Sequence, residues 1–119
     1  MSQRMTIQEL RDSLKKKPKY RNEKTVVNGI TFDSKKEANR YKDLKLMEKA
    51  GKIRAIRIQF PCRLVANGIY ICDYIADFVY RDQETGKDVV EDAKGVRTKE
   101  YRLKAKLFEA CYGFKILET

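Results

Sequence analysis

The stretch VVEDAKG, residues 89–95, places two carboxylates and an ammonium inside a segment that otherwise has the apolar pattern of a buried strand. Burying an ionised group is costly unless the group is paired, hydrogen-bonded or bound to metal. Side chains alternate along a strand, so Asp92 and Lys94 share one face, and Glu91 points to the opposite layer. A β-bulge would exchange the faces of the strand on which the two acids lie. The pattern predicts a site in which Asp92 acts together with Lys94.

A second carboxylate lies in the preceding apolar run, IYICDYIADFVY, where Asp77 is expected on one face with Ile75 and Val79. If the two strands pair through the polar turn between them, Asp77 and Asp92 come within a few ångströms of each other. Two such carboxylates repel each other unless a cation lies between them. A hard divalent ion suits this arrangement, because Mg²⁺ binds through one or two carboxylates together with water and phosphate oxygens.

Glu37 is a candidate third acid. In a helix expected over residues 34–50 it lies at the centre of the apolar stripe, at nearly the same angle as Tyr41 and Leu44. Ser34 and Glu37 also have the spacing of a capping box, in which the carboxylate bonds back to the start of its own helix. The residues therefore leave two roles open for Glu37, a ligand at the site and a helix cap.

The composition limits the kinds of partner and of catalysis that are open to this chain. The chain has 119 residues, enough for one domain, with 37% charged residues and a net charge of +10, which predicts attraction to a polyanion such as nucleic acid. It contains no histidine, so catalysis must use carboxylates, lysine, tyrosine or metal. The three cysteines form no CxxC pair, and no signal peptide or run of about 18 apolar residues occurs, so we expect a cytoplasmic protein without a membrane span.

The elements that must position these residues form one small α/β (α+β) domain over residues 23–119, around a mixed sheet flanked by helices. Residues 1–22 are expected to be a basic appendage, either helical or flexible. The Asn28-Gly29 pair predicts a hairpin, and Thr98 predicts the cap of a second helix. The expected order is a hairpin over 24–32, a helix over 34–50, strands over 53–65, 69–80 and 87–94, a helix over 98–111 with Leu103, Leu107 and Cys111 on its inner face, and a strand over 114–117.

This pattern resembles the PD-(D/E)XK nuclease superfamily. The resemblance rests on Asp77, on the run Asp92-Ala93-Lys94, and on Glu37 in the preceding helix, with the order helix, three strands, helix, strand. More narrowly, YRNEKTVVNGITFDSKKEANRY, IQF, YIADFVY and VVEDAKGVRTKEY resemble a phage-encoded family of formerly unknown function, itself similar to Holliday-junction resolvases and transposon-end endonucleases. Ala76 stands where the superfamily signature has proline, which is not a ligand.

The resemblance implies roles for these positions. Asp77 and Asp92 would bind Mg²⁺ or Mn²⁺, and Glu37 would complete the shell directly or through water. Lys94 would position the attacking water and stabilise charge on the phosphate. Gln59 matches a family position and would contact metal-bound water or DNA, although a strand glutamine bonded to backbone is an equal alternative. If the domain is phage-encoded, the cytoplasm is that of the host bacterium.

Basic residues indicate where DNA would lie. On the second helix Lys99, Arg102 and Lys106 share one face, which is either a DNA surface or merely solvated. Thr98 and the amides at the start of that helix are suited to a phosphate. The expected DNA-binding set is completed by Arg97 before this helix and by a second strip containing Lys52, Arg54, Arg57 and Arg63.

Three functions remain open on the sequence. The first is a Mg²⁺-dependent endodeoxyribonuclease that acts on branched or recombination DNA. The second is a non-catalytic DNA-binding module on a nuclease fold, and the third is a structural protein with a fortuitous DxK triplet. The inward charges favour the enzyme. Symmetric cutting of two strands would require a homodimer.

Overall fold

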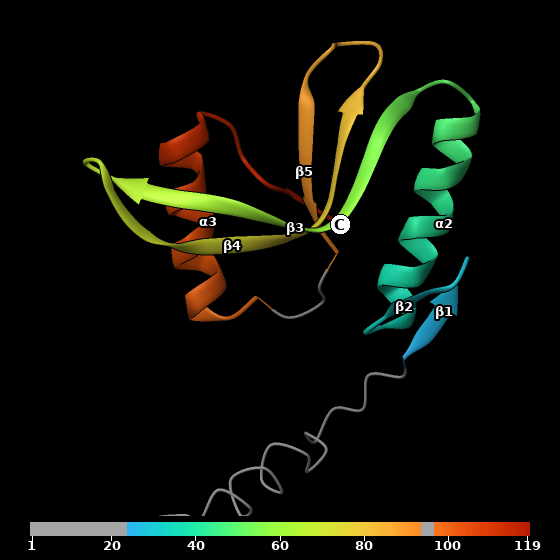
Figure 1. The fold of residues 1–119 in the computed structure, drawn as a ribbon, viewed down its shortest axis with the longest axis horizontal. Helices are drawn as coiled ribbons and strands as arrows, with labels where there is room; N and C mark the ends of the chain where they lie inside the picture. Colours follow the sequence, from blue (N-terminus) through green and yellow to red (C-terminus); the bar gives the residue numbers. More distant parts are fainter. Residues whose placement is uncertain (1–23, 94–96) are drawn as a thin grey trace, which may run out of the picture.

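The computed structural model describes residues 24–93 and 97–119, which form an α+β fold (Figure 1). Its elements in chain order are β1 (Thr25–Val27), β2 (Ile30–Phe32), α2 (Lys35–Lys49), β3 (Ile53–Ala66), β4 (Ile69–Asp82), β5 (Asp88–Asp92), α3 (Lys99–Tyr112) and β6 (Leu117–Glu118). The sheet order is β3-β4-β5-β6, antiparallel except for the parallel pair β5–β6, and β1–β2 is a separate hairpin. The predicted fold class and element order are confirmed.

Local sequence signals account for the turns and helix starts. Asn28 and Gly29 have φ values of 51° and 76°, the left-handed conformation that a tight two-residue hairpin turn requires. The Ser34 hydroxyl accepts a hydrogen bond of 3.1 Å from the Glu37 amide, and Thr98 caps α3 in the same way through the Tyr101 amide. The predicted hairpin and both predicted helix caps are therefore present.

The sheet has a helix on each face, and each helix encloses its own core. Figure 1 shows α2 and α3 on opposite sides, with β3 and β4 turning at their middle so that one half of the hairpin lies near α2 and the other along α3. We call the two buried clusters the α2 core and the α3 core. The α2 core consists of Phe32, Ala38, Tyr41, Leu44, Ile53, Phe78, Tyr80 and Ala93, and the α3 core of Cys62, Leu64, Tyr74, Ala76, Val79, Val90 and Phe108.

The inner face of α3 differs from the expected one. Leu103 was expected inside, but its side chain is 69% exposed. Leu107 packs against the α3 core as predicted, and Cys111, although exposed, contacts the Val65 backbone on β3 through its Sγ. Phe108 is the buried residue of the helix, with its ring centroid 6.0 Å from that of Tyr74, and its large ring fills more of the space against the hairpin than Leu103 would.

The bend in the hairpin changes which residues share a face. Asp77 was expected on one face with Ile75 and Val79, but Ile75 is 42% exposed whereas Val79 belongs to the α3 core together with Ala76. Alternation is therefore interrupted near Asp77. Gln59, whose φ is 48°, lies across from this point on β3, and a positive φ in a non-glycine residue is typical of such irregular strand geometry.

Two strand boundaries also differ from the expected ones. β5 ends at Asp92 rather than near residue 94, and the last strand is Leu117–Glu118 rather than 114–117. Lys94 and the predicted appendage over 1–22 lie outside the described residues. Among the helices that are described, none is long and apolar enough to cross a membrane.

Candidate functional site

Asp77 and Asp92 lie on neighbouring strands at corresponding positions. The last pair of the β4–β5 ladder is Phe78 with Glu91, and Asp77 and Asp92 are the residues next to that pair on the two strands. Both carboxylates are 1% exposed. Within the described residues, the structure thus brings together the two acids that the sequence singled out.

Asp92 is held between two donors from its own chain. The Tyr74 hydroxyl donates to Asp92 Oδ2 at 2.8 Å, and Arg97 Nη1 lies 3.0 Å from Asp92 Oδ1. Burial and the bond to Asp92 raise the pKa of Tyr74, so its phenol remains neutral at physiological pH. Arg97 also contacts Glu118 Oε2 at 3.2 Å, and its guanidinium carbon lies 5.2 Å from the centre of the Tyr101 ring. The described environment of Asp92 therefore includes a neutral donor and a cation.

Asp77 is fixed by a backbone amide and by Gln59. Its Oδ2 accepts a hydrogen bond of 2.8 Å from the Ala93 amide, and its Oδ1 accepts one of 3.3 Å from Gln59 Nε2. The Ala93 contact ties the bend of β4 to the end of β5. Gln59, which was predicted as an accessory residue, thus bonds to a candidate ligand rather than only to backbone.

Glu37 lies on the other side of Gln59. It is buried in the first turn of α2, and a cavity of about 150 Å³ is lined by both Glu37 and Gln59, together with Thr31, Phe32, Asp33 and Ile58. Ser34 supplies its half of the predicted capping box, so the structure leaves both roles of Glu37 open. No group of three or more acidic, cysteine or histidine side chains suited to a metal occurs among the described residues. Glu37 and Gln59 line one cavity, and Gln59 bonds to Asp77, so Glu37 lies on the far side of Gln59 from the two aspartates.

Glu91 faces the opposite layer, as predicted, and belongs to a buried ion pair that the sequence did not reveal. Arg40 on α2 forms two hydrogen bonds with its carboxylate, at 2.7 and 2.9 Å, and Glu91 itself is 0% exposed. The Tyr80 hydroxyl donates to the same group at 2.8 Å, and the Thr119 hydroxyl at 3.2 Å. Burial and the bond to Glu91 raise the pKa of Tyr80 to about 12, so its phenol stays protonated as a donor. These contacts anchor β5, and therefore Asp92, to α2.

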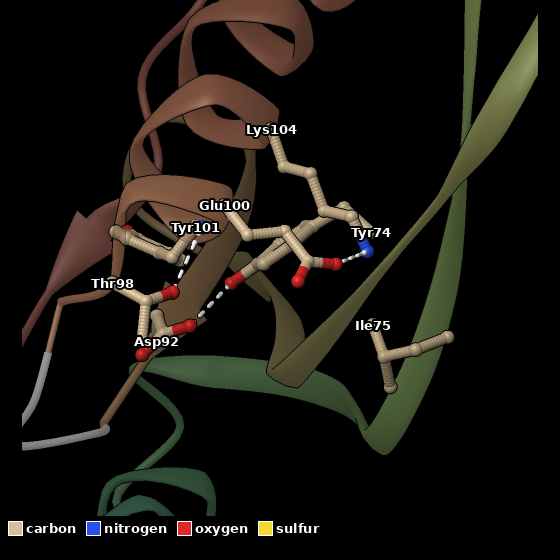
Figure 2. A pocket seen from close by; sticks show the side chains of 7 residues that line it. All are labelled: Tyr74, Ile75, Asp92, Thr98, Glu100, Tyr101 and Lys104. Carbon is tan, nitrogen blue, oxygen red and sulfur yellow. Dashed lines mark hydrogen bonds and ion pairs between the residues drawn. The ribbon is translucent and has the colours of Figure 1, made fainter. Parts of the chain in front are cut away.

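A cavity of about 290 Å³ opens beside Asp92 at the start of α3 (Figure 2). It is lined by Tyr74, Ile75, Asp92, Thr98, Glu100, Tyr101 and Lys104. Figure 2 shows Asp92 and Thr98 at one end, and Lys104 bonded to Glu100 toward the other. The site is therefore reached by solvent from the side where α3 begins.

The predicted DNA-binding residues are distributed unevenly around this opening. Lys99, Arg102 and Lys106 are all exposed on α3, the helix whose first turn borders the cavity. Arg54 and Arg57 are exposed on β3, separated from β5 by β4. The Arg57 guanidinium lies 4.9 Å from the centre of the Phe60 ring, and that of Arg63 lies 4.6 Å from the Tyr70 ring. Of these basic residues, those on α3 lie on an element that borders the Asp92 cavity, and Thr98, also predicted to bind DNA, lines the cavity itself.

Sequence reasoning missed Tyr74 and Arg40 as partners of the site. Tyr74 is one of seven tyrosines, and no local signal separates it from the others. The available clue was its place on β4, two positions before Ala76 and three before Asp77. Arg40 lies 51 residues from Glu91, so only the packing of α2 on the sheet reveals their contact.

Comparison with known proteins assigns the chain to a family. Residues 17–117 match the family described as protein of unknown function (DUF1064), and because the match spans most of the sequence, the chain belongs to that family. No curated protein and no solved structure matches the chain.

Proposed function

We propose that this member of DUF1064 is a metal-dependent endodeoxyribonuclease of the PD-(D/E)XK kind that cleaves branched or recombination DNA. The observation that supports this most directly is the opposed pair of buried carboxylates, Asp77 and Asp92, next to the start of α3. Two buried acids on neighbouring strands, one of them lining a cavity at the start of a basic helix, suit a cation and a phosphate.

The residues at this position fit a magnesium or manganese ion. Hard divalent ions take oxygen ligands, and Mg²⁺ is commonly bound by one or two carboxylates with water and substrate oxygens in the remaining positions. Asp77 and Asp92 would hold it, with Glu37 acting through water beyond Gln59. The bound ion would supply a hydroxide-like nucleophile at neutral pH and stabilise charge on the phosphate.

The surrounding residues have separate tasks in this proposal. The Ala93 amide and Gln59 orient the Asp77 carboxylate, and Tyr74 orients that of Asp92. Lys94, two residues after Asp92, supplies positive charge to the scissile phosphate. The N-terminal amides of α3 and the exposed Lys99 and Arg102 hold the neighbouring phosphates. Readout of DNA is therefore through its backbone and shape, in keeping with the +10 charge.

Cleavage of labelled four-way junction, fork and linear duplex tests the proposal. Each substrate is incubated with Mg²⁺, Mn²⁺ or EDTA, and products are resolved on denaturing gels. We expect metal-dependent cutting that favours a branched substrate. Paired symmetric cuts on a four-way junction would indicate that a homodimer acts on it. Binding of every substrate without cutting under any metal condition would instead favour the non-catalytic DNA-binding module.

Arg102→Ala is expected to weaken duplex binding and to reduce the slope of log K against log salt by about one unit, because one phosphate contact is lost. Fluorescence anisotropy measures the slope between about 50 and 200 mM salt, under conditions in which one protein molecule binds each duplex. Lys49→Ala, at the last turn of α2, removes the same charge on the other side of the sheet and should leave the slope unchanged. An Arg102 variant with the wild-type slope would remove α3 from the DNA interface.

A further inference from the structure

Two of the donors bound to the Asp92 carboxylate differ in charge and in freedom to move. Tyr74 is a neutral phenol and belongs to the α3 core, where packing holds its ring. Arg97 is a cation, its side chain is 21% exposed, and it lies between the end of β5 and the cap of α3. Each carboxylate oxygen has two lone pairs, so the phenol can stay when a metal binds. A guanidinium 3.0 Å from the same carboxylate opposes a second cation there by direct repulsion.

We infer that Arg97 is an exchangeable counter-ion, which neutralises Asp92 in the metal-free protein and is displaced by the divalent ion to become a phosphate ligand. The inference deepens the proposed function and rests on it. The contacts of Arg97 within the described residues include the Asp92 carboxylate, the Asp92 carbonyl oxygen at 3.4 Å, Glu118 and the ring of Tyr101. Losing the contact with the Asp92 carboxylate leaves those with Glu118 and Tyr101, which keep the guanidinium near the first turn of α3.

The exchange couples the binding of metal to the binding of DNA. Without metal, the positive charge of Arg97 is used within the protein, and the buried Asp92 is stable without an external ion. With metal bound, that same charge is available to the DNA backbone, where a guanidinium forms two parallel hydrogen bonds with phosphate. Metal and DNA therefore strengthen each other's binding through one side chain.

Mn²⁺ binding without DNA tests the inference independently of catalysis. Isothermal titration calorimetry or electron paramagnetic resonance compares the wild type with Arg97→Gln, Lys99→Gln and Asp92→Asn. Lys99→Gln is the matched control, because it removes one exposed positive charge two residues away. We expect Arg97→Gln to bind Mn²⁺ about fivefold or more tightly than Lys99→Gln does, which reports loss of the competing cation beyond the general change in charge. Asp92→Asn should abolish binding.

A second measurement uses the unaltered protein, in case Arg97→Gln does not fold. The side-chain Nε–H resonances of Arg97 and Arg40 are followed by NMR during addition of Mg²⁺. We expect the Arg97 resonance to shift or broaden at the metal concentration that saturates the site, whereas that of Arg40, bonded to the buried Glu91, stays unchanged.

The outcomes separate this inference from the proposed function. Equal or weaker Mn²⁺ binding by Arg97→Gln relative to Lys99→Gln, or an Arg97 resonance unmoved at saturation, overturns the exchange while the wild type still binds metal through Asp92. Absence of divalent-ion binding in the wild type and in Arg97→Gln overturns both. Tighter binding in Arg97→Gln that disappears when Asp92→Asn is added supports both.

Discussion

Asp92→Asn is expected to lower the rate of metal-dependent DNA cleavage by roughly 10³-fold or more, since it removes a charged ligand from the ion that generates the nucleophile. Asparagine has nearly the same shape as aspartate, and its side-chain oxygen can still accept the hydrogen bond from Tyr74. The fold should therefore be preserved. Alanine would instead leave the buried Tyr74 hydroxyl without this acceptor and would confuse a loss of stability with a loss of chemistry.

The measurement is single-turnover cleavage of the preferred branched substrate at saturating protein, with binding followed in parallel by anisotropy. Asp88→Asn is the matched control, because Asp88 lies on the same strand but is exposed and forms an ion pair with Arg81. DNA binding by Asp92→Asn should remain within a few-fold of the wild type. Wild-type cleavage by Asp92→Asn would rule out the assigned site.

The parts of this structure that sequence could predict are those specified by nearby residues. The Asn28-Gly29 turn and the Ser34 and Thr98 caps each depend on two to four consecutive positions, and all three are present. Opposition of Asp77 and Asp92 also followed from local information, because the short polar turn between β4 and β5 restricts the register of the two strands. The core of the candidate site was therefore accessible before the fold was known.

The features that sequence could not predict depend on the packing of distant elements. The positive φ values of Ala55 and Gln59 interrupt β3, and this bend decides that Val79 rather than Ile75 is buried. The choice of Phe108 over Leu103 as the inner residue of α3 depends on the bent hairpin that the helix contacts. Periodicity alone allows either Phe108 or Leu103 to face inward, and tertiary packing decides between them.

We expect the ion pair between Arg40 and Glu91 to make the largest single electrostatic contribution to the stability of β5. Arg40→Ala should lower the free energy of unfolding by about 3 kcal/mol, because it leaves the fully buried Glu91 carboxylate with hydroxyl partners in place of the guanidinium. Urea denaturation at neutral pH, followed by circular dichroism, measures the change. Arg81→Ala breaks the exposed pair with Asp88, whose side chains are 42% and 49% exposed, and should cost about 0.5 kcal/mol.

A double variant distinguishes loss of the pair from loss of the Arg40 side chain itself. In Arg40→Ala with Glu91→Gln, no unpaired charge remains buried, so the double variant should be more stable than Arg40→Ala alone. If adding Glu91→Gln gives no recovery, the cost of Arg40→Ala arises from lost packing on α2 rather than from a stranded carboxylate. Recovery would mean that Arg40 makes the buried charge of Glu91, next to Asp92, tolerable. Arg40 neutralises Glu91 on the α2 side, and Arg97 neutralises Asp92 on the α3 side. Asp92 lines the cavity beside α3, so the pair of Asp92 and Arg97 is the one that we expect a metal ion to exchange.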